Sequence, residues 1–165
     1  MITTQTIKEL RGVTGAGIMD CKKALQEAEG NLNDAIDILR KQGFAKAAKK
    51  AHREVSQGLV EAYIHTGGRI GALVEVNCES DFVAKTDELK TLAHDLTMQV
   101  AATDPTFLSS EGIPEGVEPG EACLLSQPFI KDPERTVQDI VTETIARVGE
   151  NIKIRRFTRF ELGKE

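Results

Sequence analysis

The stretch that decides the fold class is GLVEAYIHTGGRIGALVEVNC, residues Gly58–Cys78 of a 165-residue chain. Apolar and polar residues alternate on both sides of Gly67 and Gly68, and a period of two residues is typical of β-strands. Two adjacent glycines favour a tight hairpin turn because glycine readily adopts positive φ angles. We therefore predict a β-hairpin with these buried positions: Leu59, Ala62, Ile64, Ile70, Leu73, Val74 and Val76.

Helical and strand patterns follow the hairpin. Apolar residues recur at helical spacing over about Thr86–Ala102, whose first residue is a suitable N-cap, and again over about Glu134–Val148. Three prolines and three glycines in Asp104–Gly120 predict a surface loop between these helices. Alternating apolar residues in Ile152–Phe160 predict a third strand. Residues 55–165 therefore predict an α+β core, in which a three-stranded antiparallel sheet packs with two helices.

The first 43 residues predict a bundle of three short amphipathic helices. Apolar residues follow the helical period in Thr3–Arg11 and in Ile18–Ala28. A third helix begins after a capping Asn31 and is expected to end at Gly43, since glycine is frequent just past helix ends. A bundle of this size is barely large enough to be stable alone, so residues 1–43 are expected to form a small appended module.

Residues 44–54 predict a basic helical linker, because FAKAAKKAHR (Phe44–Arg53) has no continuous apolar face. Residues 1–53 carry ten Lys and Arg against six Asp and Glu, whereas the rest carries eleven against twenty, and the whole chain has a net charge of −5. An acidic chain with few aromatic residues is poorly suited to nucleic acids. We predict no direct nucleic-acid binding, with RNA contact through Lys46–Arg53 as the alternative.

Composition also bears on the compartment. No apolar run approaches the roughly 20 residues of a membrane helix, and the N-terminal residues lack the segments of a signal peptide. Cys21, Cys78 and Cys123 are odd in number and widely spaced, which argues against a disulfide framework and favours a reducing environment. We expect a cytoplasmic protein without a membrane partner.

Patterns for catalysis, cofactors and metals fail on inspection. The glycines of Gly12–Gly17 follow a predicted helix and precede no GK[ST] sequence, so a phosphate-binding loop is not predicted. His52, His65 and His94 show no metal-ligand spacing to a cysteine. We predict no catalytic residue, no cofactor and no metal.

One short segment remains unexplained by these patterns. In ESDFVAKTDEL (Glu79–Leu89), Phe82 lies among charged residues, directly after the predicted hairpin. Ser80 or Asp81 can cap the helical turn that carries it. The ring either closes the edge of the sheet over the helix or protrudes as an interface anchor. The pattern alone leaves both possibilities open.

Four segments resemble the elongation factor Ts family. LRGVTGAGIMDCKKAL (Leu10–Leu25) and VEVNCESDFVAKTDEL (Val74–Leu89) resemble its two signature segments, and Leu124–Asp132 and Gly149–Gly163 resemble its C-terminal part. The likeness spans essentially the whole chain. It implies a guanine-nucleotide exchange factor for the GTPase elongation factor Tu that performs no bond chemistry, with an N-terminal module like a ubiquitin-associated (UBA) domain. The alternative is a non-catalytic binding module that uses the three-helix domain.

The resemblance also implies which residues contact the partner. Residues matching Arg11, Ile18 and Met19 lie on the face of the N-terminal module toward the GTPase. The segment that disturbs the bound Mg²⁺ of the GTPase matches Ser80, Asp81, Phe82 and Val83. Within it the aromatic ring enters a pocket of the partner, supported by the acid before it, so the resemblance favours a displayed Phe82.

The number of core units points to an oligomer. Long members of the family have a duplicated core, whereas this chain has one, so it resembles the short form. Short members are similar in acting as dimers, and an apolar strand at Ile152–Phe160 exposed at a sheet edge would have reason to pair. We predict a homodimer that forms a 2:2 complex with elongation factor Tu through residues 55–165.

Overall fold

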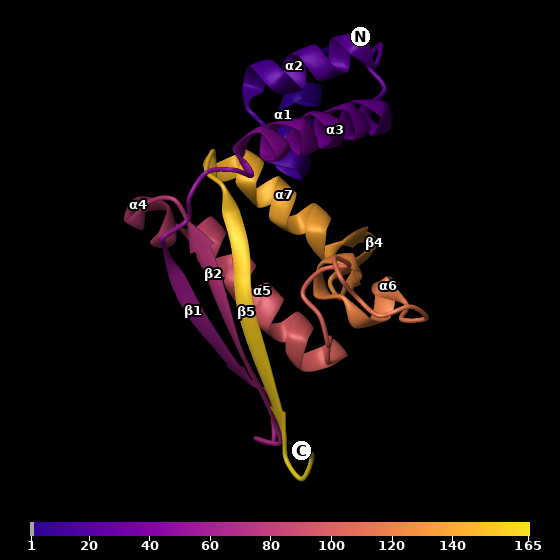
Figure 1. Ribbon diagram of the computed structural model, residues 1–165. Helices are drawn as coiled ribbons and strands as arrows, with labels where there is room; N and C mark the ends of the chain where they lie inside the picture. The colour runs from indigo at the N-terminus through magenta and orange to yellow at the C-terminus, as the bar shows by residue number, and fades with distance from the viewer. Residues whose placement is uncertain (1) are drawn as a thin grey trace.

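The computed structural model describes residues 2–165 and has an α+β architecture, as predicted, with a helical bundle above a sheet-and-helix core (Figure 1). The bundle contains α1 (Thr4–Thr14), α2 (Ile18–Glu27) and the first part of α3 (Leu32–Lys50). Thr3 begins α1 with a capping box shared with Thr6, and Asn31 caps α3 as predicted. Their common core is buried and small: Leu10, Cys21, Ala24, Leu25, Ala28, Ala35 and Leu39.

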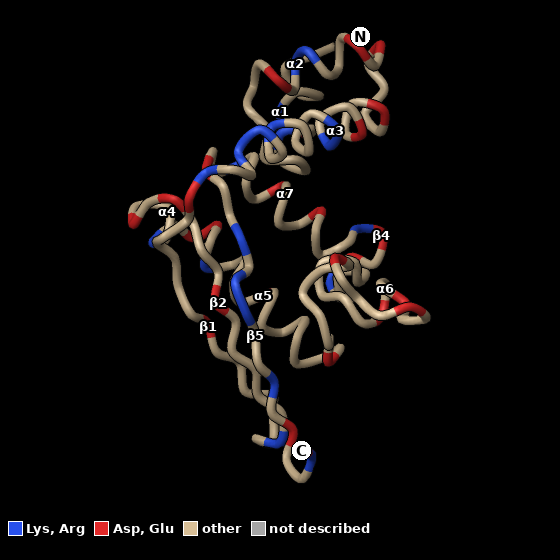
Figure 2. Tube along the Cα trace, viewed as in Figure 1, with Lys and Arg blue, Asp and Glu red and all other residues tan. Residues whose placement is uncertain are grey.

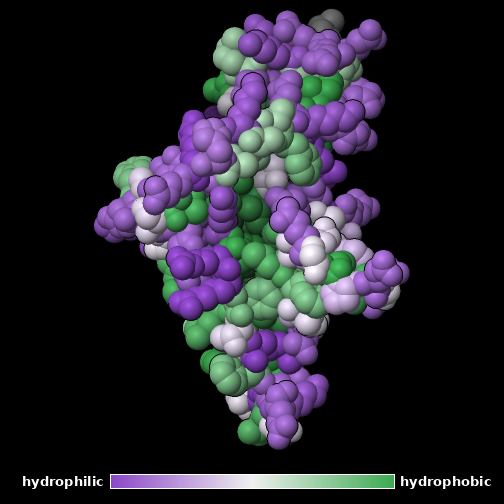
Figure 3. Space-filling model, viewed as in Figure 1, coloured by the Kyte–Doolittle hydropathy of each residue, from purple (hydrophilic) through white to green (hydrophobic). Residues whose placement is uncertain are grey.

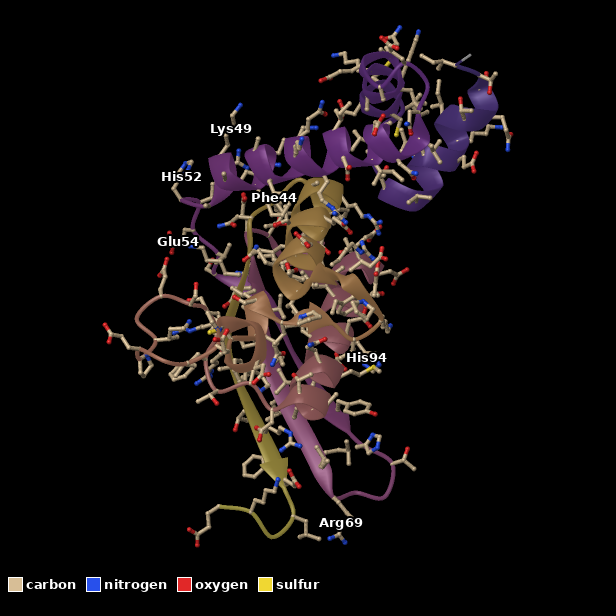
Figure 4. All side chains as sticks on the ribbon, turned by 90° about the vertical axis from the view of Figure 1, so that its right-hand side faces the viewer. Phe44, Lys49, His52, Glu54, Arg69 and His94 are labelled. Atoms are coloured by element: carbon tan, nitrogen blue, oxygen red, sulfur yellow. The ribbon has the colours of Figure 1, made fainter. Side chains whose placement is uncertain are left out.

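The third helix does not end at Gly43, and this prediction was wrong. α3 continues to Lys50, so the residues from Phe44 onward extend the same helix. This segment is helical, as predicted, and most of its residues are exposed, with Ala47 and Lys50 half-buried. Gly43 is buried, and a Cβ placed on it would lie 4.0 Å from the Cβ of Ala146 on the facing helix. Figure 4 shows Phe44 on the side of α3 that faces the core, and Ala47 packs against the core. A small residue thus brings two helices together here.

The predicted three-stranded antiparallel sheet is confirmed. It contains β1 (Gln57–Ile64), β2 (Ile70–Cys78) and β5 (Ile152–Glu161) in the order β1-β2-β5, so β2 is central and β5 lies at an edge. β1 and β2 form the predicted hairpin, with Leu59 opposite Val76. A register shift between Glu75 and Val76 interrupts the pairing of β2 with β5.

Two long helices cover one face of this sheet, as predicted. α5 (Asp87–Thr103), capped by Thr86, packs on the sheet, and α7 (Val137–Val148) packs against α5 and against α3. α7 begins three residues later than expected, because the residues before it form a small ribbon with β3 (Pro128–Phe129) and β4 (Asp132–Thr136). The sequence did not predict this ribbon, nor two short helical turns, α6 (Pro119–Ala122) and η1 (Leu124–Ser126).

The sheet leaves its other face uncovered, and this corrects part of the predicted hairpin core. Ala62, Ile64 and Leu73 were predicted to be buried but are exposed, whereas Val74 and Val76 are fully buried. Successive side chains of a strand point to opposite faces, and α5 covers only one of them. The outer face therefore carries apolar side chains in contact with solvent.

The loop predicted in Asp104–Gly120 is largely irregular apart from the start of α6. The segment between α6 and β3, which follows this loop, is fixed by Gln99 of α5, whose Nε2 donates to Gln127 Oε1 at 3.1 Å and to the carbonyl of Pro128 at 3.1 Å. In Figure 3 apolar residues gather in a hollow between β5 and this loop. No helix within residues 2–165 combines the length and the hydropathy needed to cross a bilayer.

Candidate functional site

The segment carrying Phe82 forms α4 (Asp81–Ala84), a single helical turn between β2 and α5. Ser80 caps this turn, with its Oγ accepting from the backbone N–H of Val83 at 3.2 Å. Val83 and Ala84 are buried in the main core, so the turn is attached through its inner side. The thiol of Cys78, also buried, donates to the carbonyl of Ser80 at 3.2 Å.

The outer side of α4 presents Phe82 to solvent. The Phe82 side chain is 81% exposed, the largest fraction among the exposed large apolar residues. Asp81 does not cap the helix but pairs with Lys85 one turn later, with 2.7 Å between Oδ2 and Nζ. Phe82 therefore does not close the sheet edge over the helix in this structure. It is an apolar side chain displayed beside an exposed ion pair.

The three N-terminal positions lie around one turn. Arg11 lies in the last turn of α1, and Ile18 and Met19 begin α2. All three are exposed, with Ile18 at 55% and Met19 at 62%. Val13, which the sequence analysis missed, is 57% exposed beside them. The helix predicted for Thr3–Arg11 continues to Thr14, so Val13 lay beyond the predicted helix and no periodic pattern marked it. These side chains form a partly apolar surface at the α1–α2 turn.

The joint between the bundle and the core lies on the other side of this turn. A cavity of about 270 Å³ is lined by residues of the α1–α2 turn, α3 and α7, beside the direct contacts between these elements. Arg147 of α7 packs so closely on Gly15 that a Cβ on Gly15 would overlap its guanidinium. Gly15 also has a φ of 67°, which only glycine adopts without strain. This contact constrains how the bundle sits on the core.

Basic residues of the predicted linker segment take part in ion pairs within the protein. Figure 2 shows Lys and Arg over the C-terminal part of α3 and along β5. Lys46 pairs with Asp20 of α2 at 2.9 Å, and Arg53 pairs with Glu79 at 3.4 Å. On β5, Arg156 pairs with Glu75 at 2.8 Å. Part of the positive charge is thus compensated locally.

The cysteine side chains are buried, and His52 and His94 are far apart from one another. The three cysteines are buried and free, and burial raises the pKa of the Cys21 and Cys78 thiols, which opposes thiolate formation. His52 and His94 lie on separate parts of the molecule (Figure 4). Within residues 2–165 no group of three or more His, Cys, Asp or Glu side chains could hold a metal ion.

Comparison with known proteins agrees with the sequence resemblance. The family model described as "Elongation factor TS" matches residues 3–121 and 116–164. Elongation factor Ts of Carboxydothermus hydrogenoformans is 52% identical over 196 residues, which cover 99% of this chain and 90% of the relative. Those of Thermoanaerobacter sp. and Syntrophomonas wolfei are each 50% identical over 99% of this chain, and over 96% and 92% of their own lengths.

These matches also show where the chain differs from its relatives. The matched span is 196 residues long and this chain has 165, so at least 31 positions of the relatives have no counterpart here. The two parts of the family match overlap at residues 116–121, which lie in the loop that carries α6. With both parts of the family model and nearly the full length of several relatives matched, this chain belongs to the elongation factor Ts family.

Proposed function

We propose that this protein is the guanine-nucleotide exchange factor of elongation factor Tu and that Phe82 is the side chain that drives nucleotide release. Family membership implies the exchange activity in translation elongation. The observation that supports the role of Phe82 is its 81% exposure on a turn whose inner side is buried. A large apolar side chain kept in water on a fixed frame is a typical interface anchor.

The proposed mechanism needs no bond chemistry. Mg²⁺ bridges the nucleotide phosphates and the GTPase, so displacing the ion weakens retention of GDP. Insertion of the Phe82 ring between helices of the GTPase would move the ligands of the ion. Complete burial of the ring yields about 1.5–3 kcal/mol, which corresponds to roughly 10- to 150-fold in an equilibrium constant. Ser80, Asp81 and Val83 would hold the ring in position.

The α1–α2 turn supplies the second proposed contact. Arg11, Ile18 and Met19 are exposed together and would bind the nucleotide domain of elongation factor Tu, which stabilises the nucleotide-free complex. Coupling is reciprocal: the factor by which this protein weakens GDP binding equals the factor by which GDP weakens binding of this protein. Binding of GTP then releases the exchange factor.

We further propose that the protein acts as a homodimer in a 2:2 complex. The outer face of the sheet carries exposed Val60, Ile64, Leu73 and Phe160, and Ile64 and Phe160 both lie beside Gly71 on neighbouring strands. Ile64 is 67% exposed and Phe160 is 71% exposed. A group of exposed apolar side chains of this kind is typical of an interface, and β5 in addition offers a free sheet edge.

A nucleotide-exchange assay tests the proposal directly. Elongation factor Tu loaded with a fluorescent GDP is mixed with one-twentieth of its concentration of this protein and an excess of unlabelled GDP. An exchange factor turns over and accelerates the complete loss of fluorescence. A passive binding module, the alternative function, would change at most a fraction equal to its own concentration.

A further inference from the structure

We infer that Glu150 and Asn151, at the turn between α7 and β5, are positioning residues that hold the Phe82 turn and the N-terminal bundle in a fixed arrangement. This inference rests on the proposed function, since it concerns how the two partner-binding surfaces are presented. Neither residue was singled out by the sequence patterns or lies on a proposed contact surface. Their role follows from their hydrogen bonds.

Glu150 holds the N-terminal end of α4. Its Oε1 accepts from the backbone N–H of Ser80 at 3.0 Å and from the Ser80 hydroxyl at 3.1 Å. The same hydroxyl accepts from the N–H of Val83, so the carboxylate fixes the residue that caps the turn. A one-turn helix has almost no stability of its own, so an external partner at its cap determines where Phe82 points.

Asn151 connects this region to the segment that leads from the bundle. Its side chain is 2% exposed, and Nδ2 donates to the carbonyl of Arg53 at 2.9 Å and to that of Ala51 at 3.5 Å. These carbonyls belong to the stretch between α3 and β1. The buried amide therefore fixes the path of the chain just after the helix that carries the bundle.

Glu79 closes the network between these segments. Its Oε1 accepts from the backbone N–H of Asn151 at 2.7 Å and pairs with Arg53 at 3.4 Å. The hydrogen bond from Asn151 lowers the pKa of the Glu79 carboxyl, and Arg53 contributes in the same direction. Three chain segments, at residues 51–53, 79–80 and 150–151, are thus joined within a few ångströms.

Such a network has a direct consequence for exchange. A surface that is already ordered loses less conformational entropy when it binds, so more of the binding free energy remains for moving the partner. Without the Glu150 contacts, the turn would remain attached to the core through Val83 and Ala84, but the direction of the Phe82 ring would no longer be fixed. Loss of the Asn151 contacts would let the Phe82 turn and the α1–α2 turn move relative to each other. The gain in affinity from binding the partner through both surfaces at once would then be smaller.

A double-mutant cycle between Glu150 and Phe82 tests the inference, because the hydrogen bonds of Glu150 go to Ser80 and none goes to Phe82. We expect Glu150→Ala to reduce the maximal rate of stimulated GDP release about five- to tenfold in the wild-type chain and less than twofold in a Phe82→Ala chain. Glu150→Gln keeps an oxygen that can accept both hydrogen bonds and should retain most activity. Asp132→Ala is the matched control: like Glu150, Asp132 accepts hydrogen bonds from a backbone N–H and from a side chain, and it lies in the β3–β4 ribbon on no proposed contact surface.

Asn151→Ala gives a different signature. We expect the concentration of exchange factor for half-maximal stimulation to rise at least threefold while the maximal rate changes less than twofold. If Glu150→Ala does not fold, Glu150→Asp replaces it, because the shorter side chain keeps the charge but does not reach Ser80. Thermal unfolding followed by circular dichroism identifies the folded variants.

The outcomes separate this inference from the proposed function. If Phe82→Ala does not change stimulated GDP release, both the proposed role of Phe82 and the positioning role of Glu150 and Asn151 are overturned. A strong Phe82→Ala effect with fully active Glu150→Ala and Asn151→Ala chains would overturn the positioning role alone. Equal losses from Glu150→Ala in both backgrounds, or an equal loss from Asp132→Ala, would also overturn it, because they would indicate a general effect on the fold.

Discussion

Phe82 combines two properties that are seldom found in one residue: a large apolar side chain and almost complete exposure. Because the ring buries little area in the free protein, Phe82→Ala should change the melting temperature by less than about 2 °C. Because it is the proposed wedge, the same change should lower stimulated GDP release at least about tenfold. Stopped-flow fluorescence and thermal unfolding measure the two quantities. A chain that unfolds yet keeps its activity per folded molecule would contradict this assignment.

The α1–α2 turn makes a second prediction at the scale of single residues. Arg11→Ala and Met19→Ala should each weaken the complex with nucleotide-free elongation factor Tu about three- to thirtyfold, because each removes an exposed contact group while leaving the bundle core intact. Isothermal titration calorimetry measures the affinity. Glu27→Ala, at the exposed C-terminal end of α2, is the control. Unchanged affinity in both variants would remove this turn from the interface.

The sequence predicted the neighbourhood of Phe82 better than its orientation. Ser80 was one of two candidate caps, and the structure shows that it caps while Asp81 pairs with Lys85. The pattern around Phe82 suited both an inward and an outward ring, since a one-turn helix has no full apolar stripe to fix its rotation. Glu150 and its partner Ser80 are 70 residues apart in the sequence, so no local pattern predicts their hydrogen bonds.

At the scale of elements, the predicted and observed ends of the third helix differ most: Gly43 was expected to end it, but α3 continues to Lys50. A glycine followed by an alanine-rich basic stretch resembled a helix end and a linker, but packing against α7 overrides that local signal. Likewise, the alternation in β1 and β2 predicted the strands correctly but not which apolar residues face α5. Both faces of β1 carry apolar residues, so periodicity alone does not choose between them.

Gly43 allows a direct test of helix continuity. Gly43→Ala should raise the free energy of unfolding by about 0.5–1 kcal/mol, because alanine is the better helix former and its Cβ would meet Ala146 at an ordinary contact distance of 4.0 Å. Gly15→Ala makes the same substitution at a site that does not tolerate it, and it should lower the free energy of unfolding by at least about 1 kcal/mol. The φ angle of Gly15 is positive, and the Arg147 side chain occupies the position of the added Cβ. Urea unfolding measures both. A destabilising Gly43→Ala would mean that the α3–α7 contact does not tolerate a methyl group.

At the scale of the whole molecule, the uncovered sheet face predicts self-association. Ile64→Lys and Phe160→Lys each place a charge on the outer face and should convert the dimer to a monomer at micromolar concentration, with little effect on folding because both residues are exposed. Light scattering measures the mass. Val13→Lys, an exposed apolar position on the bundle, should remain dimeric. A wild-type chain with monomer mass and intact exchange activity would contradict the proposed dimer.

The ion pairs of the sheet predict how stability depends on pH. The pKa of Glu75 is lowered by the Asn77 amide and by Arg156, that of Glu79 by the N–H of Asn151, and that of Glu161 by Arg159 and Lys164. A carboxyl whose pKa is lower in the folded state stabilises the fold above the unfolded value, roughly 4.3, and this contribution is lost as pH falls through the folded value.

We therefore expect a nearly constant melting temperature between about pH 5 and pH 7 from these groups and a progressive decrease below about pH 4. Differential scanning calorimetry over this range provides the measurement. Glu79→Gln cannot be titrated and should show a shallower decrease in acid than the wild-type chain. A melting temperature that rises on acidification below pH 4 would contradict the assigned direction.

The loop that carries α6 has a practical consequence. In Figure 1 it lies on the opposite side of the molecule from α4, and nothing lies within 4 Å of a Cβ placed on Gly112 or Gly116. Lengthening an exposed loop costs little entropy, and the two parts of the family match meet within this loop. The loop is therefore a natural place to graft a fluorescent reporter or an affinity handle, because it lies away from the proposed contact surface on α4.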